Sequence, residues 1–166
     1  MTPDLATCLW FENGTEAMAA ARFYTGLLPD SGIGTVTRYP DIALPEGAVS
    51  AGDPMVVSFR IAGRAFLALN GGMKQPYHYS QSTVIPCADQ AEIDRLWAVF
   101  IDAGGQGGQC GWLTDRWGVH WQITPAALQG WASGPPARVK ALMEEMMTMS
   151  KPDIARLTAA AGLTRV

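Results

Sequence analysis

The sequence predicts an α+β fold in which two βαβββ modules are followed by a C-terminal helical tail. Three observations lead to this expectation: apolar runs of strand length alternate with amphipathic helical segments, the same order of elements occurs twice, and two further helical segments follow the last strand. We expect one domain over residues 1–133, with modules at about 1–75 and 76–133. A tail over residues 134–166 is expected to pack on the same domain.

The first module begins with an apolar run that ends at the turn signal Glu12-Asn13-Gly14. A segment rich in helix formers follows, with Asn13 or Thr15 as its cap, and two later strands flank the hairpin turn Ala62-Gly63. We expect strands at residues 5–11, 34–39, 55–61 and 64–69, and a helix at residues 15–24. Its buried stripe is expected to hold Met18, Ala21, Phe23, Leu27 and Leu28.

The second module repeats this order, because a shift of 76 residues places the first strand and helix on the fifth strand and the second helix. Asp89 and Glu92 have the spacing of a capping box before that helix. We expect strands at residues 82–87, 109–114 and 119–124, and tail helices at about 136–149 and 152–161. The core stripe of the second helix is expected to contain Ile93, Leu96, Trp97, Phe100 and Ile101.

The composition is that of a globular protein with no signal for nucleic acid or membrane binding. Of 166 residues, 48% are hydrophobic and 16% charged, and 12 Lys and Arg stand against 15 Asp and Glu, so no basic surface for nucleic acid is indicated. No apolar run reaches the roughly 18 residues of a membrane span, and residues 1–20 lack the basic start of a secretory signal. Three cysteines without a CxxC motif favour a reducing compartment. We expect a cytoplasmic protein.

Several phrases of the sequence resemble a known superfamily. They are CLWF at residues 8–11, AARFYTGLL at 20–28, FLALNGG at 66–72, DQAEID at 89–94, GGQCGWLTDRWGVHWQITP at 107–125 and KPDIARLTAA at 151–160. They resemble the vicinal oxygen chelate (glyoxalase/bleomycin resistance/dioxygenase) superfamily, within it the PhnB-like or demethylubiquinone methyltransferase-like branch. The resemblance covers essentially the whole chain and implies a glyoxalase-like fold, in which the curved mixed sheets of the two modules surround a cavity.

The same resemblance implies where a divalent metal would be bound. Metal-using relatives take ligands from the inward faces of the first, fourth, fifth and eighth strands, which correspond to positions near Thr7, near Asn70, near Ser82 and at Gln122. None of these is a carboxylate or an imidazole, the groups that hold divalent ions well. We therefore predict no metal and no other cofactor, and keep a His78/His120 pair as the remaining metal alternative.

The methyltransferase label of the branch has no support from the residues. A methyl-donor cofactor usually lies over a Gly-rich turn between a strand and the helix that the turn opens. The glycines of residues 104–108 instead follow a helix, and Gly71-Gly72 leads into a loop.

Five residues are candidates for lining a ligand pocket, whereas no catalytic residue is assigned. The chain holds six tryptophans, and aromatic side chains commonly line sites for planar or apolar ligands. In the strand at 119–124, residues 120 and 122 share a face, so Trp121 is expected to face the helices. The three cysteines are expected to be inert, with Cys8 and Cys87 as packing residues at equivalent ends of the modules. The pocket candidates are Trp10, Asn70, Trp112, His120 and Gln122.

Two functions stay open at this point. One is a metal-free protein that binds a small, partly apolar or aromatic molecule; the alternative is a divalent-metal-dependent lyase, isomerase or dioxygenase. The apolar positions of the tail, among them Met143, Met146 and Met149, exceed what a lone surface helix needs. We expect a homodimer, with a monomer whose tail covers its own sheet as the alternative.

Overall fold

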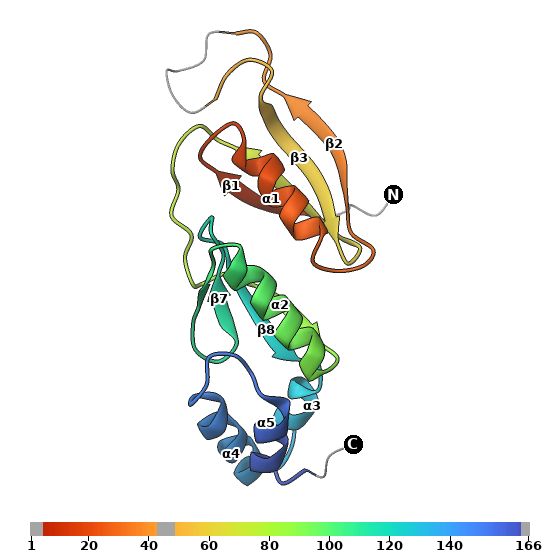
Figure 1. The fold of residues 1–166 in the computed structure, drawn as a ribbon, viewed down its shortest axis with the longest axis vertical. Helices are drawn as coiled ribbons and strands as arrows, with labels where there is room; N and C mark the ends of the chain where they lie inside the picture. Colours follow the sequence, from red (N-terminus) through yellow and green to blue (C-terminus); the bar gives the residue numbers. More distant parts are fainter. Residues whose placement is uncertain (1–4, 43–48, 164–166) are drawn as a thin grey trace. The chain divides into compact units, whose positions relative to one another are not determined.

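The computed structural model describes residues 5–42 and 49–163. Within these ranges eight strands and five helices are present, and the chain divides into two compact units, residues 1–76 and 77–166 (Figure 1). Each unit contains one four-stranded mixed sheet with a helix of at least ten residues between its first two strands. The predicted α+β class with two βαβββ modules is confirmed.

The first unit has the strand order β1-β4-β3-β2. Strands β1 and β4 run parallel, with Thr7 opposite Phe66, and the other two pairs are antiparallel. Strand β2 begins two residues earlier than expected. The elements are β1 (Thr7–Phe11), α1 (Glu16–Thr25), β2 (Gly32–Arg38), β3 (Pro54–Ile61) and β4 (Arg64–Asn70).

The second unit repeats this topology with the order β5-β8-β7-β6, and here β5 and β8 are the parallel pair. The predicted strand at 109–114 is shorter than expected, and no residue range was predicted for the two-residue β6 at the sheet edge. The elements are β5 (Thr83–Cys87), α2 (Gln90–Asp102), β6 (Gln106–Gly107), β7 (Trp112–Thr114) and β8 (His120–Pro125), followed by α3 (Leu128–Ala132), α4 (Pro136–Met146) and α5 (Ile154–Ala160).

In each unit the helix covers one face of its sheet. On α1, the buried residues include Ala17, Ala20 and Ala21, whose small side chains let the helix approach the sheet closely. Tyr24 stacks on Phe59 of β3 at a centroid distance of 6.0 Å. The predicted stripe is wrong in part: Ala21 and Leu27 are buried, but Met18, Phe23 and Leu28 are only half-buried.

The helix face of the second sheet agrees more closely with the sequence. Ile93, Leu96 and Phe100 are fully buried as expected, while Ile101 is exposed. The ring of Trp121 lies 5.3 Å from that of Phe100 and is completely buried, which confirms that Trp121 faces the helix.

The N-termini of α1 and α2, the helices that cover the two sheets, are satisfied in different ways. The predicted cap of α2 by Asp89 is confirmed, since Asp89 accepts a hydrogen bond from the Glu92 N–H at 2.9 Å. The Glu92 carboxylate accepts in return from the Ala88 N–H at 2.8 Å, one residue before the position of a regular capping box. Thr15 precedes α1 without a side-chain cap. The N–H of Ala17 in its first turn is instead satisfied from β4, by the side chain of Asn70 at 3.0 Å.

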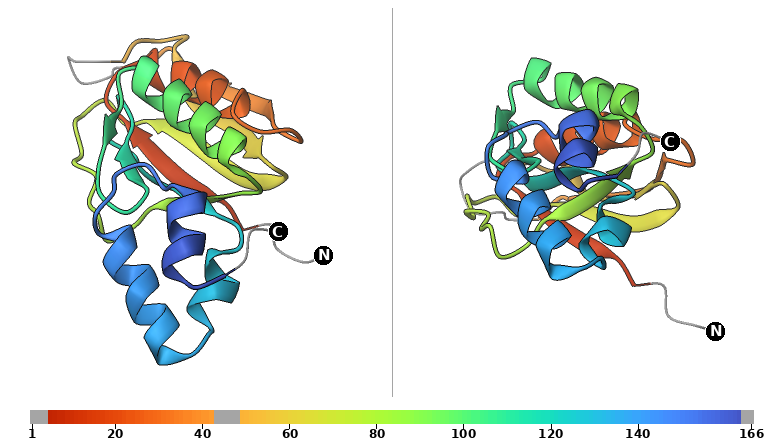
Figure 2. Two further views of the ribbon diagram at one scale, coloured as in Figure 1. Left: turned by 60° about the horizontal axis from the view of Figure 1, so that its bottom comes forward. Right: turned by 90° about the horizontal axis from the view of Figure 1, so that it is seen from below.

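The tail helices pack on one another and on the start of α2. Their own core consists of Leu142, Met146, Met149, Leu157 and Ala161. Figure 2 shows α4 and α5 side by side in both views. Gln90 joins α5 to α2: its amide accepts from Ile154 N–H at 2.8 Å and donates to the Pro152 carbonyl at 3.1 Å. Among the described residues, no helix is long and apolar enough to cross a bilayer.

Candidate functional site

Three of the five pocket candidates lie together on the sheet face of the second unit that α2 does not cover. Alternation along β8 turns Trp121 and Ile123 toward the helix and His120 and Gln122 to the opposite side. Neighbouring strands add their own alternate residues to that side. We call this surface the open face; it consists of Val84, Trp112, Thr114, His120 and Gln122.

Gln122 lies at the centre of the open face. It is directly opposite Val84 on one neighbouring strand and Trp112 on the other. Its Nε2 donates to Ser82 Oγ at 2.8 Å, which fixes the orientation of the amide. Its Oε1 has no partner among the described residues, so the face presents one available acceptor beside a half-buried indole.

His120 is held by contacts on several sides and is 6% exposed. The ring of Tyr79 stacks on the imidazole at a centroid distance of 4.0 Å, and Nδ1 lies 3.0 Å from Thr114 Oγ1. Burial lowers the pKa of His120, although Asp115 and a backbone hydrogen bond with Tyr77 act in the opposite direction. The imidazole is therefore neutral at pH 7, and the five residues of the open face carry no formal charge.

A groove of about 530 Å³ runs along one side of Gln122. Val84 and Pro86 of β5 form one wall, and Leu128 and Ala132 of α3 form the other. Helix α3 was not predicted, and this wall was therefore not expected from the sequence. The groove is within the 300–1,000 Å³ of typical small-molecule sites.

Asp115 positions the strands of the open face without being part of it. Its carboxylate accepts from the N–H groups of Trp117 and Val119 at 2.9 and 3.0 Å, and from Trp121 Nε1 at 2.9 Å. These bonds fix the β7–β8 turn and thereby the start of β8. The signal in the sequence was the Asp-Arg-Trp-Gly turn, in which an Asp side chain commonly binds backbone N–H groups two residues ahead.

The other two candidates belong to the first unit. Trp10 lies on the face of its sheet away from α1, and its Nε1 donates to the Met73 carbonyl at 2.8 Å. The indole packs on Gly71, where a Cβ would come within 1.8 Å of the ring.

Asn70 differs from the expectation that it lines a pocket. It is fully buried on the α1 side, where its Nδ2 donates to the carbonyls of Gly14 and Pro54 and its Oδ1 accepts from Ala17. Because every hydrogen-bonding group of the amide is engaged, Asn70 joins strands β3 and β4 to the α1 turn.

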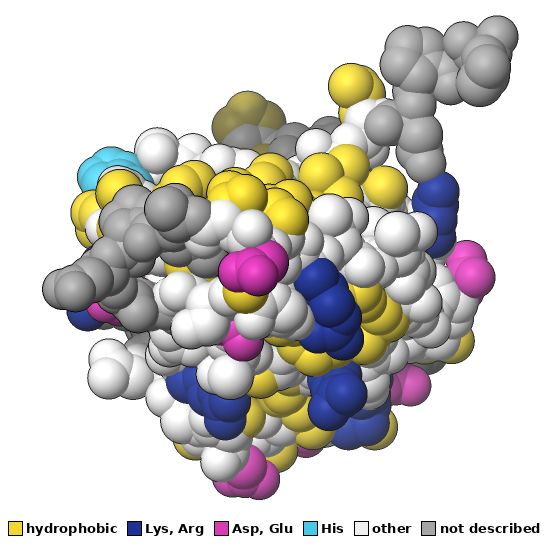
Figure 3. All heavy atoms as spheres, turned by 90° about the horizontal axis from the view of Figure 1, so that it is seen from above, with side chains coloured by type: hydrophobic (Ala, Val, Ile, Leu, Met, Phe, Trp, Pro, Cys, Tyr) yellow, Lys and Arg dark blue, Asp and Glu magenta, His cyan; other side chains and the backbone are white. Residues whose placement is uncertain are grey.

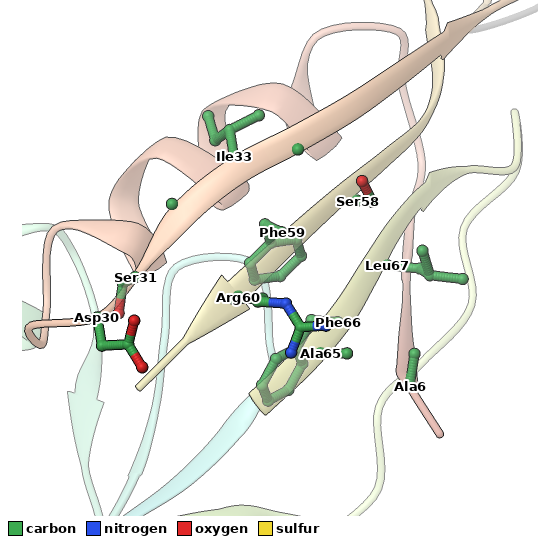
Figure 4. A pocket seen from close by; sticks show the side chains of 12 residues that line it. Ala6, Asp30, Ser31, Ile33, Ser58, Phe59, Arg60, Ala65, Phe66 and Leu67 are labelled. Carbon is green, nitrogen blue, oxygen red and sulfur yellow. The ribbon is translucent and has the colours of Figure 1, made fainter. Parts of the chain in front are cut away.

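A second concavity, of about 590 Å³, lies on the first unit and contains none of the five candidates (Figure 4). The side chains of Ser31, Ser58 and Arg60 are engaged by the backbone around them, and Asp30 adds a carboxylate. Ser58 Oγ bonds both the N–H and the carbonyl of Thr35, and Arg60 donates to Gly63 at 2.6 Å. This concavity follows the bulge of β2.

The residues present do not fit a divalent metal of the kind the superfamily suggests. None of the eight strands contains Asp or Glu, and His120 is the one histidine among their residues. In the described part of the chain no three potential His, Cys, Asp or Glu ligands cluster. His78 is exposed, and its Nδ1 accepts from the Ser80 N–H at 3.1 Å.

The expectation that both Cys8 and Cys87 are packing residues is correct only for Cys87. Cys87 is fully buried, and burial, reinforced by Glu92, raises the pKa of its thiol to about 12. Cys8 is exposed on β1, and the module register aligns it with Val84 rather than with Cys87. The two thiols are therefore not at equivalent positions.

The glycines after α2 have a structural explanation. Gly104 adopts a φ of +96°, which ends the helix, and a Cβ at Gly105 would approach the carbonyl oxygens of Phe100 and Thr114 to within 2.9 Å. They allow the chain to turn tightly from α2 into β6, and they do not open a helix.

Over the surface seen in Figure 3, basic and acidic side chains are interspersed with apolar ones.

Comparison with known proteins identifies relatives of this chain. The family model of 3-demethylubiquinone-9 3-methyltransferase matches residues 3–124. Among curated proteins nothing matches. Among solved structures, a PhnB protein of Bacillus cereus, described as a 3-demethylubiquinone-9 3-methyltransferase, is 26% identical with a TM-score of 0.60; the match covers 75% of this chain and 100% of that one.

Two more distant structures share the fold. Protein PA1353 of Pseudomonas aeruginosa is 21% identical over 75% of this chain and 98% of its own, with a TM-score of 0.56. The fosfomycin resistance protein FosX of Listeria monocytogenes, complexed with Mn(II) and sulfate, is 12% identical with a TM-score of 0.52, over 78% of this chain and 94% of its own.

Proposed function

The chain belongs to the PhnB-like, 3-demethylubiquinone-9 3-methyltransferase-like family of the vicinal oxygen chelate superfamily, and from this we propose that it binds a small, uncharged, partly aromatic molecule on the open face of its second unit without a metal. The observation that carries the proposal is the combination on one sheet face of an indole, a stacked Tyr79–His120 pair and the available acceptor of Gln122.

Each part of the open face would recognise a different part of such a ligand. The ring of Tyr79 lies 5.7 Å from that of Trp112, so the two present aromatic surface to a flat or apolar group. Gln122 Oε1 would accept a hydrogen bond from a hydroxyl or amide of the ligand. Because the face is uncharged, it offers no partner to an ionic group, which would lose its hydration without compensation.

Metal-dependent chemistry is not part of this proposal because the donor set is unsuitable. The open face offers a neutral imidazole engaged by Thr114 and an amide engaged by Ser82, whereas divalent ions in such folds require several imidazole or carboxylate ligands. FosX is similar to this chain in fold alone, so its Mn(II) does not transfer. Methyl transfer is not proposed either, since the glycine runs serve as turns.

Isothermal titration calorimetry with a panel of neutral aromatic alcohols and amides tests the proposal, in EDTA and again with Mn²⁺. We expect binding in EDTA that weakens about tenfold in Gln122→Leu, the loss of one ligand hydrogen bond. The matched control is Gln106→Leu on the edge strand β6, which should leave affinity within twofold. A site that needs Mn²⁺, or equal affinity in the two variants, would refute it.

We further propose that the protein is a cytoplasmic homodimer. The exposed Met143 on α4 and Met147 directly after it support the homodimer, and the three free thiols support a cytoplasmic location. Static light scattering at micromolar concentration tests the homodimer: a mass near 17.8 kDa contradicts it, and twice that value supports it.

A further inference from the structure

A separate apolar pocket of about 730 Å³ lies in the second unit, between the start of α2, the turn that links β8 to α3, and helix α5. Trp131, Ile154 and Leu163 supply its larger apolar side chains, and Ala127 and Ala155 its small ones. This volume and this composition are typical of sites for small organic molecules. None of the five residues of the open face lines it.

The tail, rather than the shared fold, builds most of this pocket. The family match ends at residue 124, and Trp131, Ile154 and Leu163 lie beyond it. The Bacillus cereus PhnB protein is matched over its full length by 75% of this chain. Most of the pocket therefore lies outside the part of the chain that the family model matches.

The frame of the pocket is fixed by hydrogen bonds that leave most of its polar groups satisfied. Gln90 uses both ends of its amide to hold α5, as described above, and also donates to Asp94 at 3.0 Å. The hydroxyl of Thr158 donates to the Ile154 carbonyl at 2.6 Å. The N–H groups of the Gln90 amide and the hydroxyl of Thr158 are thus already used in hydrogen bonds within the protein.

Asp153 is the one charged side chain among the lining residues. Its Oδ1 caps α5 by accepting from the Arg156 N–H at 3.0 Å. Its second carboxylate oxygen has no partner among the described residues. The pocket thus combines an apolar wall with a single negative charge, so its complement is an apolar molecule that carries one positive charge.

We propose that this pocket binds a small aromatic amine, with the ring against Trp131 and Ile154 and the ammonium group beside the carboxylate of Asp153. A cation that keeps contact with solvent at the mouth retains part of its hydration while it gains the ion pair. The ring replaces water on the apolar wall, which supplies the larger share of the affinity.

The test is calorimetry on the whole chain with three probes of similar size: 2-phenylethylamine, 3-phenylpropan-1-ol and 3-phenylpropanoate. We expect a dissociation constant on the order of 0.1–1 mM for the amine, the range for a ligand of this size. The alcohol should bind several-fold more weakly and the carboxylate should not bind.

Two pairs of variants locate the site. Ala155→Leu fills the pocket and should weaken the amine at least tenfold, whereas Ala159→Leu, on the same helix but outside the lining, should leave it within twofold. Asp153→Asn keeps a good helix cap and removes the charge, so it should reduce the preference for the amine over the alcohol to near unity. Thermal unfolding checks that each variant is folded.

Several results would overturn the proposal. They are no binding of the amine at 5 mM, equal affinity in Ala155→Leu and Ala159→Leu, an unchanged preference in Asp153→Asn, or loss of binding in Gln122→Leu. The last would assign the amine to the open face instead.

Discussion

Replacement of Asn70 by Ala should destabilise the first unit more than any surface change in it. Asn70 is fully buried and makes three hydrogen bonds, to the N–H of Ala17 and to the carbonyls of Gly14 and Pro54. At about 1 kcal/mol for each bond, with a further cost for leaving the Ala17 N–H buried without a partner, the loss sums to about 3–5 kcal/mol.

A more conservative substitution should be no better. Asn70→Asp keeps an acceptor for Ala17 but cannot donate to the two carbonyls, and its charge would be buried against their oxygen atoms. We expect it to cost at least as much as Asn70→Ala.

The assay combines urea unfolding with hydrogen exchange of individual backbone amides. The control is Asn13→Ala, since Asn13 accepts from Thr15 N and Oγ1 at an exposed position, where the loss is about 0.5–1 kcal/mol. The exchange protection of the Ala17 amide should fall selectively in Asn70→Ala. If the two variants lose similar stability and Ala17 stays protected, Asn70 is not the connection between strand and helix described above.

Three further changes test other contacts. Asp115→Ala leaves two backbone N–H groups and an indole N–H without their acceptor, so it should cost about 3 kcal/mol in urea unfolding; a loss below 1 kcal/mol would contradict its positioning role. Gly71→Ala should displace the Trp10 ring, cost about 1–3 kcal/mol and change tryptophan fluorescence, whereas Gly32→Ala, which meets no atom within 4 Å, should change neither. Burial lowers the pKa of His120, so the free energy of unfolding should be highest above the unfolded-state pKa of about 6.5 and should decrease as the pH falls through the folded-state pKa. His120→Asn should remove this pH-dependent part of the stability. An NMR titration that gives His120 a pKa above 6.5 would refute the prediction.

The sequence predicted the fold because its signals are local. Strand alternation, the Ala62-Gly63 hairpin and the Asp89 cap each act within a few residues, and each has its expected place in the structure. The cap of α1 could not be found in this way, because its donor is satisfied by Asn70 from a strand more than fifty positions along the chain. Helix α3 has five residues and no polar cap, so it leaves no pattern to detect.

The candidate site was predictable only where the two faces of a strand differ. In β8, His120 and Gln122 alternate with Trp121 and Ile123, and the polar face is evident. In β4, both faces are apolar: Phe66 and Ala68 face α1 and Leu67 and Leu69 face away. Alternation there does not show which side the helix covers. Asn70 became a candidate through the resemblance to metal-using relatives, and the structure shows it buried on the α1 side.

The attachment of residues 77–82 to the open face has a consequence for binding kinetics. Tyr79 stacks on His120, Ser82 accepts from Gln122, and the backbone of Tyr77 bonds His120. A molecule that takes the place of Tyr79 against the imidazole enters only after this segment has separated from the sheet. Its observed association rate should then rise with concentration and level off at the rate of that separation, whereas a molecule entering the groove beside Val84 should associate at a rate that rises linearly.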